Sequence, residues 1–401
     1  MKSSTNLKYQ FLGQGISKLF SLLFYIILAR SLGEDEFGKF SYALTICLIF
    51  GYPLTQLGLD ILVVKWVSRG KLGVARSALR ICSVSSLFAV GLIVAISYLV
   101  RVEKLTIYLL MIYLISQSFQ NILFAYLRGQ EYMKLEGILL PIQRLFYIII
   151  FLILLNFGIK KSSSGAFSIA LSVIWGLSCL RVLMGKDIKL IYLNTYNTIK
   201  KRTLIKEALT LTAVSMLWMV YFRVDSFMLG IMRNDIDVGI YNAAYRLVEG
   251  IFILPGIIMI VYFPKLAKKI NFNKIFLLLL IGLGALGTLL SITIYLLAPF
   301  IIKILYAGKF TGSISVLQIL SITLFFVFIG HLTTQSLIAL DMNKIYLALT
   351  AIGASINILL NYFLILIYGP KGAALSTVFT EGMITLITGG VVWEKIRHGL
   401  Q

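Results

Sequence analysis

The sequence predicts an all-α integral membrane protein with about twelve transmembrane helices in two six-helix bundles. Hydrophobic residues make up 59% of the chain and charged residues only 13%, against roughly 25% charged in soluble domains. Apolar runs of about 20 residues, enough to cross ~30 Å of hydrocarbon, alternate with short charged turns. The ~10-residue alternating segments of a membrane β-barrel are absent from the sequence.

Hydropathy windows of about 20 residues predict twelve spans. These lie at roughly 10–30, 39–63, 79–100, 105–127, 137–158, 163–184, 208–231, 238–263, 275–298, 314–339, 345–368 and 373–393. The longest inner loop separates an N-terminal lobe (1–184) from a C-terminal lobe (207–401), with a cytoplasmic linker at 185–206.

Basic residues predict the orientation of the spans. The net charge is +21, and most Lys and Arg residues fall on alternate turns, which should therefore be cytoplasmic, together with both termini. These residues separate apolar runs and form no soluble basic domain, so the charge does not indicate nucleic-acid binding. Lys2 and Lys8 precede an apolar run without a small-residue cleavage site, so we expect a first membrane helix and not a signal peptide.

The two halves of the sequence resemble each other. Gly38 and Gly239 follow corresponding Leu-Gly pairs, and the next spans carry Pro53 and Pro255 at matching places. Proline removes a helical hydrogen bond, so both residues are predicted helix hinges. An even number of spans per half gives a parallel repeat, and paired interrupted helices point to a transport site between the halves. The alternative is that Gly and Pro are simply common in membrane helices.

Several short motifs carry a family resemblance. They are A-R-x-L-G at 29–33 with F-G at 37–38, G-L-D at 58–60, Asp225, L-G at 229–230, V-G-I-Y at 238–241 and F-P at 263–264. This pattern resembles polysaccharide repeat-unit (O-antigen type) flippases, of the multidrug/oligosaccharidyl-lipid/polysaccharide exporter superfamily.

The resemblance implies two lobes in a V around a central cavity that opens alternately to each side. It also implies a cargo of undecaprenyl-pyrophosphate-linked oligosaccharide, moved from the inner to the outer leaflet of the bacterial cytoplasmic membrane for lipopolysaccharide and other polysaccharide biosynthesis. Membrane lipids and a polysaccharide polymerase are the further partners it suggests.

Four basic residues lie inside predicted spans, where a charge costs about 2.5–3.5 kcal/mol at the bilayer centre and should face a cavity or a partner. Arg223 and Arg246 lie at similar depth on adjacent helices, about 12 Å from the outer ends. Lys18 and Arg144 lie roughly 10–12 Å from the inner ends of two other spans. We interpret all four as pyrophosphate ligands. The alternatives are neutralisation within a lobe, such as Arg246 with Glu249 or Asp225, and snorkelling of Lys18 and Arg144.

Four acids are candidates for cation coupling by Na⁺ or H⁺: Asp225, Glu249, Glu381 and Asp60. Salt-bridge duty is the competing interpretation for each, and it is the favoured one for Asp60. The two histidines and the three cysteines show no metal-ligand spacing, and no phosphate-binding G-x-x-x-x-G-K-[ST] loop is present, so neither a metal site nor ATP hydrolysis is expected.

Two other functions compete with a flippase. A multidrug or cation antiporter of the same superfamily would favour a cavity dominated by acids, whereas the spans here carry four deep cations. A membrane glycosyltransferase or polymerase would need a large outer loop with paired acids or bases. The longest outer turn, around 299–313, carries Lys303 and Lys309 and no carboxylate, so we predict a transporter without catalytic residues.

Overall fold

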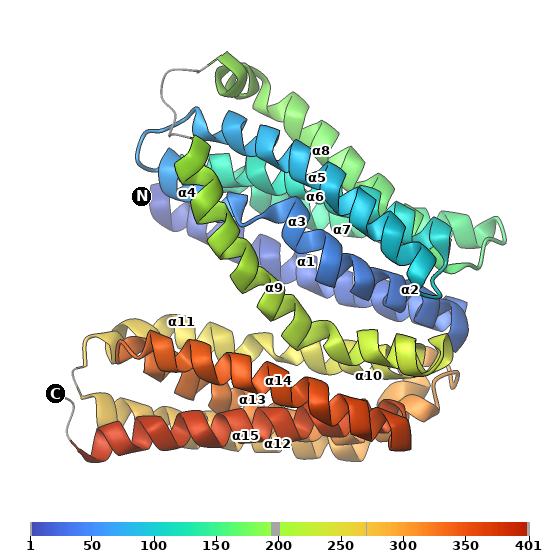
Figure 1. Cartoon of the computed structure of the whole chain (residues 1–401), viewed down its shortest axis with the longest axis vertical. Coiled ribbons are helices and arrows are strands. Elements are labelled where there is room, and N and C mark those ends of the chain that lie inside the picture. Colours follow the sequence, from blue (N-terminus) through green and yellow to red (C-terminus); the bar gives the residue numbers. More distant parts are fainter. Residues whose placement is uncertain (1, 194–200, 270, 399–401) are drawn as a thin grey trace. The chain divides into compact units, whose positions relative to one another are not determined.

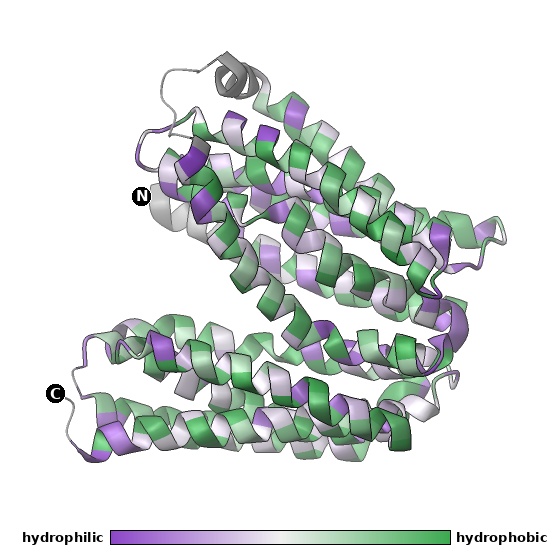
Figure 2. Cartoon of the chain, viewed as in Figure 1, coloured by the Kyte–Doolittle hydropathy of each residue, from purple (hydrophilic) through white to green (hydrophobic). Residues whose placement is uncertain are grey.

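The computed structural model describes residues 2–193, 201–269 and 271–398, and every regular element within these ranges is a helix (Figure 1). Twelve described segments are long and apolar enough to cross a membrane. The predicted all-α membrane class is therefore confirmed. Hydrophilic residues lie mostly at helix ends and turns, with hydrophobic residues along the helices between them (Figure 2).

The chain folds into two compact units, Met1–Arg223 and Val224–Gln401. Helix α9 (Lys201–Met232) begins in the first unit and ends in the second. Part of the predicted linker, residues 194–200, lies outside the described residues. The described remainder of the linker is helical, so the assignment of 185–206 as a separate segment stays a prediction.

The first unit is built around its fourth span. Helix α6 packs against α8, α5, α4 and α2, while α1 runs along α7. The bounds are α1 (Lys2–Leu32), α2 (Glu34–Ile46), the π-helix η1 (Cys47–Gly51), α3 (Tyr52–Gln56), α4 (Leu59–Val67), α5 (Val74–Leu99), α6 (Lys104–Gly129), α7 (Lys134–Asn156) and α8 (Ser162–Leu193), which is kinked at Gly185.

The second unit is also built around its fourth span. Helix α13 packs against α12, α15, α10 and α11, while α14 packs against α15. The bounds are α10 (Asp235–Ile251), α11 (Ile253–Ala267), α12 (Phe272–Tyr306), α13 (Gly312–Ala339), α14 (Asn343–Tyr368) and α15 (Pro370–Arg397). The second, third and sixth spans of each half therefore surround an equivalent central helix, as a parallel repeat requires.

The helix of the second span in each unit is interrupted. In the first unit the π-helix η1 precedes Pro53, and α3 ends at Gln56. Leu57 and Gly58 follow it, both left-handed with φ 49° and 61°. A Cβ on Gly58 would lie 2.5 Å from the Leu211 side chain of α9, so only glycine fits this break. In the second unit Phe252 separates α10 from α11, and Pro255 lies in the first turn of α11. Their role as moving hinges stays a prediction.

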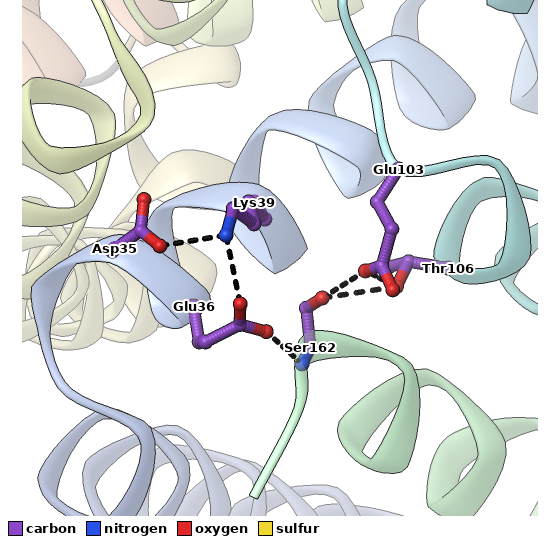
Figure 3. A network of polar contacts seen from close by, with 6 residues as sticks. All are labelled: Asp35, Glu36, Lys39, Glu103, Thr106 and Ser162. Atoms are coloured by element: carbon purple, nitrogen blue, oxygen red, sulfur yellow. Dashed lines mark hydrogen bonds and ion pairs between the residues drawn. The ribbon is translucent and has the colours of Figure 1, made fainter.

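A polar network ties together the starts of three helices of the first unit (Figure 3). Glu36 of α2 accepts a hydrogen bond from the backbone N–H of Ser162 at 2.7 Å, and Glu103 accepts hydrogen bonds from the hydroxyls of Ser162 and Thr106. Lys39 pairs with Asp35 at 2.6 Å and Glu36 at 2.8 Å. Carboxylates are favourable near helix N-termini, so this cluster stabilises the ends of α2, α6 and α8.

Candidate functional site

Arg144 of the first unit is held by tyrosines. Its Nη1 donates a hydrogen bond to the Tyr147 hydroxyl, its guanidinium lies 4.7 Å from the centre of the Tyr147 ring, and it also interacts with Tyr113 and Tyr25. Arg144 forms no ion pair with any carboxylate that the structure describes. A half-buried guanidinium thus keeps its positive charge uncompensated within a membrane-spanning helix.

The tyrosines extend this site across three spans. Tyr113 lies on α6 and Tyr25 on α1, while the Tyr52 hydroxyl on α3 interacts electrostatically with both Tyr113 and Asp60. Each of these four side chains is half-buried. Polar groups within a membrane span are unfavourable against acyl chains. The surface that carries these four side chains is therefore better suited to water than to lipid. We call Tyr25, Tyr52, Asp60, Tyr113, Arg144 and Tyr147 the Arg144 cluster.

Lys18 lies outside the Arg144 cluster. It is exposed on α1, seven residues before Tyr25, which is about 10 Å along a helix. It has no hydrogen bond or ion pair with the part of the chain that the structure describes. Snorkelling toward the inner surface accounts for such a residue as well as ligand binding does, so a shared entrance with Arg144 stays a prediction.

Asp225 of the second unit is fully enclosed by neutral hydrogen-bond donors. Its side chain is 3% exposed. The Tyr241 hydroxyl donates to Oδ2 at 2.7 Å, Thr377 Oγ1 donates to Oδ2 at 2.9 Å, and Asn361 Nδ2 donates to Oδ1 at 2.5 Å. Because α9, α10, α14 and α15 each supply one of these residues, a single carboxylate connects four helices of this unit.

The network continues along α14 and α15. Asn361 Nδ2 also donates to Asn357 Oδ1 at 3.0 Å, and Asn357 Nδ2 lies 3.3 Å from the hydroxyls of both Ser376 and Thr380. The Asn361 side chain is fully buried, yet its Oδ1 accepts no hydrogen bond from the described residues. An unsatisfied acceptor next to a buried carboxylate is suited to a proton or a small hard cation, which oxygen ligands prefer.

The remaining predicted residues lie in different settings. Arg246 Nη1 pairs with Glu249 Oε2 at 2.9 Å, the neutralisation that their three-residue spacing allows. The described contacts of Asp225 are with neutral donors and do not supply the alternative Asp225–Arg246 pair. Arg223 is half-buried at the end of the first unit, and Glu381 is half-buried on α15.

Sequence reasoning missed the neutral partners of both charged sites. For Asp225 a signal was present, because Asn357 and Asn361 lie four residues apart in an otherwise apolar span and so share a helix face. For Arg144 the signal is weak, since tyrosine is common at membrane interfaces and 21 tyrosines are spread along the chain.

Comparison with known proteins agrees with this architecture. The family model described as "Polysaccharide biosynthesis protein" matches residues 4–269, so the chain belongs to that family. It is therefore a multi-pass transmembrane transporter, a flippase or exporter, of the polysaccharide biosynthesis family. No curated protein sequence gives a significant match.

Solved structures show the same fold at low sequence identity. An inward-facing multidrug resistance MATE family transporter of the MOP superfamily shares 16% identity with a TM-score of 0.76, covering 99% of this chain and 98% of that one. A MATE transporter from Vibrio cholerae shares 12% identity with a TM-score of 0.62 and covers 99% and 98%. A MOP superfamily transporter from Pyrococcus furiosus, whose binding pocket is described as having reverse polarity, shares 16% identity with a TM-score of 0.62 and covers 99% and 95%.

Proposed function

We propose that this protein is a flippase that moves pyrophosphate-linked lipid oligosaccharides from the inner to the outer leaflet of a bacterial cytoplasmic membrane. The observation that carries the proposal is the uncompensated guanidinium of Arg144 within a membrane span of the first unit. Membership of the polysaccharide biosynthesis family supports a cargo destined for surface polysaccharide.

A pyrophosphate suits the Arg144 cluster chemically. Guanidinium groups bind phosphate oxygens through paired N–H donors. Hydrogen bonds to Tyr147 and Tyr113 restrain the orientation of the Arg144 guanidinium. An ion pair with a protein carboxylate would compete with the ligand, and Arg144 has none among the described residues. We therefore assign Arg144 as the main pyrophosphate ligand of the first unit, with Lys18 and Arg223 as further contacts.

We further propose that the buried network around Asp225 carries the coupling cation, Na⁺ or H⁺. Asp225 supplies the negative charge, and Asn361 Oδ1 supplies a buried acceptor without a partner in the described chain. Moving one charge through 100 mV is worth about 2.3 kcal/mol, so an anionic pyrophosphate leaving a negative-inside cell already moves downhill. A cation bound at Asp225 would then favour the return of the cargo-free protein from the outward-open to the inward-open state.

Reconstitution tests the cargo directly. Purified protein in liposomes should move a fluorescent polyprenyl-pyrophosphoryl oligosaccharide between leaflets, and Arg144→Gln should lower the rate by roughly 10–100-fold, as expected from the loss of charge-assisted hydrogen bonds worth about 1.5–3 kcal/mol. Arg80→Gln is the matched control, because Arg80 is an exposed arginine on α5. Wild-type rates in Arg144→Gln would remove the proposed site.

A multidrug or cation antiporter is the second candidate. The buried Asp225 network favours it, as does a fold shared with multidrug transporters. The same liposomes separate the two functions. Cation-driven uptake of a cationic dye, without movement of the lipid probe, would establish the antiporter and exclude the flippase.

A further inference from the structure

We propose that Tyr52, Asp60 and Tyr113 of the Arg144 cluster form a sugar-binding subsite that recognises the first sugar after the pyrophosphate. This inference rests on the proposed function. It adds which part of the cargo is recognised, and by which side chains.

The three side chains are continuous with Arg144 across the first unit. Tyr113 accepts a hydrogen bond from Arg144, and the Tyr52 hydroxyl interacts with both Tyr113 and Asp60. Tyr52 and Asp60 lie in the second span, Tyr113 in the fourth and Arg144 in the fifth, and all four side chains are half-buried. A ligand whose anionic group contacts Arg144 can therefore extend over the two tyrosine rings toward Asp60.

Asp60 requires a polar environment at its position. It lies seven residues before the end of α4, about 10 Å along the helix. It makes no hydrogen bond or ion pair with any described residue, although a bare carboxylate is costly against acyl chains. It lies in the first turn of α4. Asp60 is therefore a half-exposed acceptor without a protein donor.

A pyranose complements this surface. Neighbouring sugar hydroxyls can donate to the two oxygens of one carboxylate, while tyrosine rings cover the apolar face of the ring and keep a polar edge. The glycosidic phosphate lies next to the first sugar, as Arg144 lies next to Tyr113. A cationic drug would bind best to an acid without a nearby cation, and here the positive charge of Arg144 would repel it.

An unsatisfied donor lies at the same break in the second span. Gln56 is 4% exposed and its Nε2 has no acceptor within the described chain, while its Oε1 accepts a hydrogen bond from Asn121 at 3.4 Å. Burying a donor without a partner is unfavourable.

The test compares two probes on the purified full chain in detergent: hexaprenyl pyrophosphate, and hexaprenyl pyrophosphate carrying one glucose. Affinities are measured by thermophoresis, and thermal unfolding confirms that each variant is folded. Asp60→Asn and Tyr52→Leu should each weaken binding of the glucose-bearing probe about tenfold or more, because the first variant weakens the acceptor for the sugar hydroxyls and the second removes a ring that covers the sugar. Both variants should bind the sugar-free probe as wild type does.

Control variants test whether the effects are specific to the cluster, and a further variant separates failure of the sugar subsite from failure of the pyrophosphate site. Asp35→Asn and Tyr98→Phe change exposed residues of the same types outside the cluster and should leave both affinities unchanged. Equal weakening of both probes by Asp60→Asn and Tyr52→Leu, or no effect on either, would overturn the sugar subsite. Undiminished binding of both probes to Arg144→Gln would instead remove the pyrophosphate site, and with it the proposed function.

Discussion

The first and fifth spans of each half of the chain contact each other, but through different chemistry. In the first unit Phe24 of α1 packs edge-on against Tyr147 and Phe151 of α7, with ring centres 5.6 and 5.9 Å apart. In the register that aligns Gly38 with Gly239, the counterpart of Phe24 is Asp225, which accepts a hydrogen bond from Asn361 of α14. The repeated fold therefore does not require a buried carboxylate at this crossing.

The neighbouring pair repeats the contrast. Tyr241 donates a hydrogen bond to Asp225, and its counterpart in the first unit is Phe40, which is fully buried with its ring 6.2 Å from that of Tyr25. Two positions that hold packed phenylalanines in the first unit, Phe24 and Phe40, therefore hold a hydrogen-bonded acid and tyrosine, Asp225 and Tyr241, in the second. The charge that stands out in a span of the first unit is instead the half-buried cation Arg144. Under the proposed function, the first unit would bind the anionic cargo and the second unit the coupling cation.

Removing the charge of the second unit should have the largest effect. We expect Asp225→Asn to abolish the response of transport to an imposed Na⁺ or H⁺ gradient, a loss of tenfold or more, roughly the value of one strong charge-assisted contact. Flipping driven by membrane potential alone should persist, because the anionic cargo carries that energy. Parallel liposome assays with each gradient in turn measure both quantities. A full gradient response in Asp225→Asn would place coupling elsewhere.

Exchanging Tyr241 for its counterpart should give a smaller change. Tyr241→Phe removes one hydrogen bond to the Asp225 carboxylate, worth about 1.5–3 kcal/mol for a charged acceptor. The cation concentration for half-maximal transport should therefore shift by roughly tenfold, while the response to the gradient itself persists. The reverse change, Phe40→Tyr, buries a hydroxyl in an aromatic core and should cost about 1–3 kcal/mol of stability without altering cation dependence. Equal cation shifts in both variants would contradict the division between the units.

The sequence alone was sufficient for the class, the twelve spans and the parallel repeat, because hydropathy and the Gly38/Gly239 register follow directly from residue order. It also named Arg144 and Asp225 among its candidate site residues, since a charge in a span is unfavourable without a partner or a cavity, and their roles stay predictions. It did not predict what surrounds them. Asn361 lies on a span far along the chain from Asp225, and such contacts between distant helices leave little trace in one sequence.

Arg246 offers a test of how much an existing ion pair reduces ligand binding. Its charge is already paired with Glu249, whose side chain is 31% exposed, and such pairs contribute about 0–1 kcal/mol. The double change Arg246→Gln with Glu249→Gln should keep lipid transport within roughly threefold of wild type, against the large loss expected for Arg144→Gln. A loss in the double variant as deep as that of Arg144→Gln would make Arg246 a cargo ligand despite its partner.

The smallest effect is expected where the two units differ at their outer helix starts. Helix α10 is capped by Asn234, whose side chain accepts a hydrogen bond from the Asp237 N–H at 2.8 Å, whereas α2 starts at Gly33 without a side-chain cap. Helix α2 relies on Lys39 and its neighbouring acids, and the counterpart of Lys39 is Ile240. Exposed pairs of this spacing are worth about 0.3–0.5 kcal/mol, so Lys39→Gln should speed hydrogen exchange at the start of α2 only slightly. Asn234→Ala removes a cap worth about 1 kcal/mol, so it should speed hydrogen exchange at the start of α10 more. The reverse order would mean that the network of Figure 3 is a stronger anchor than a helix cap.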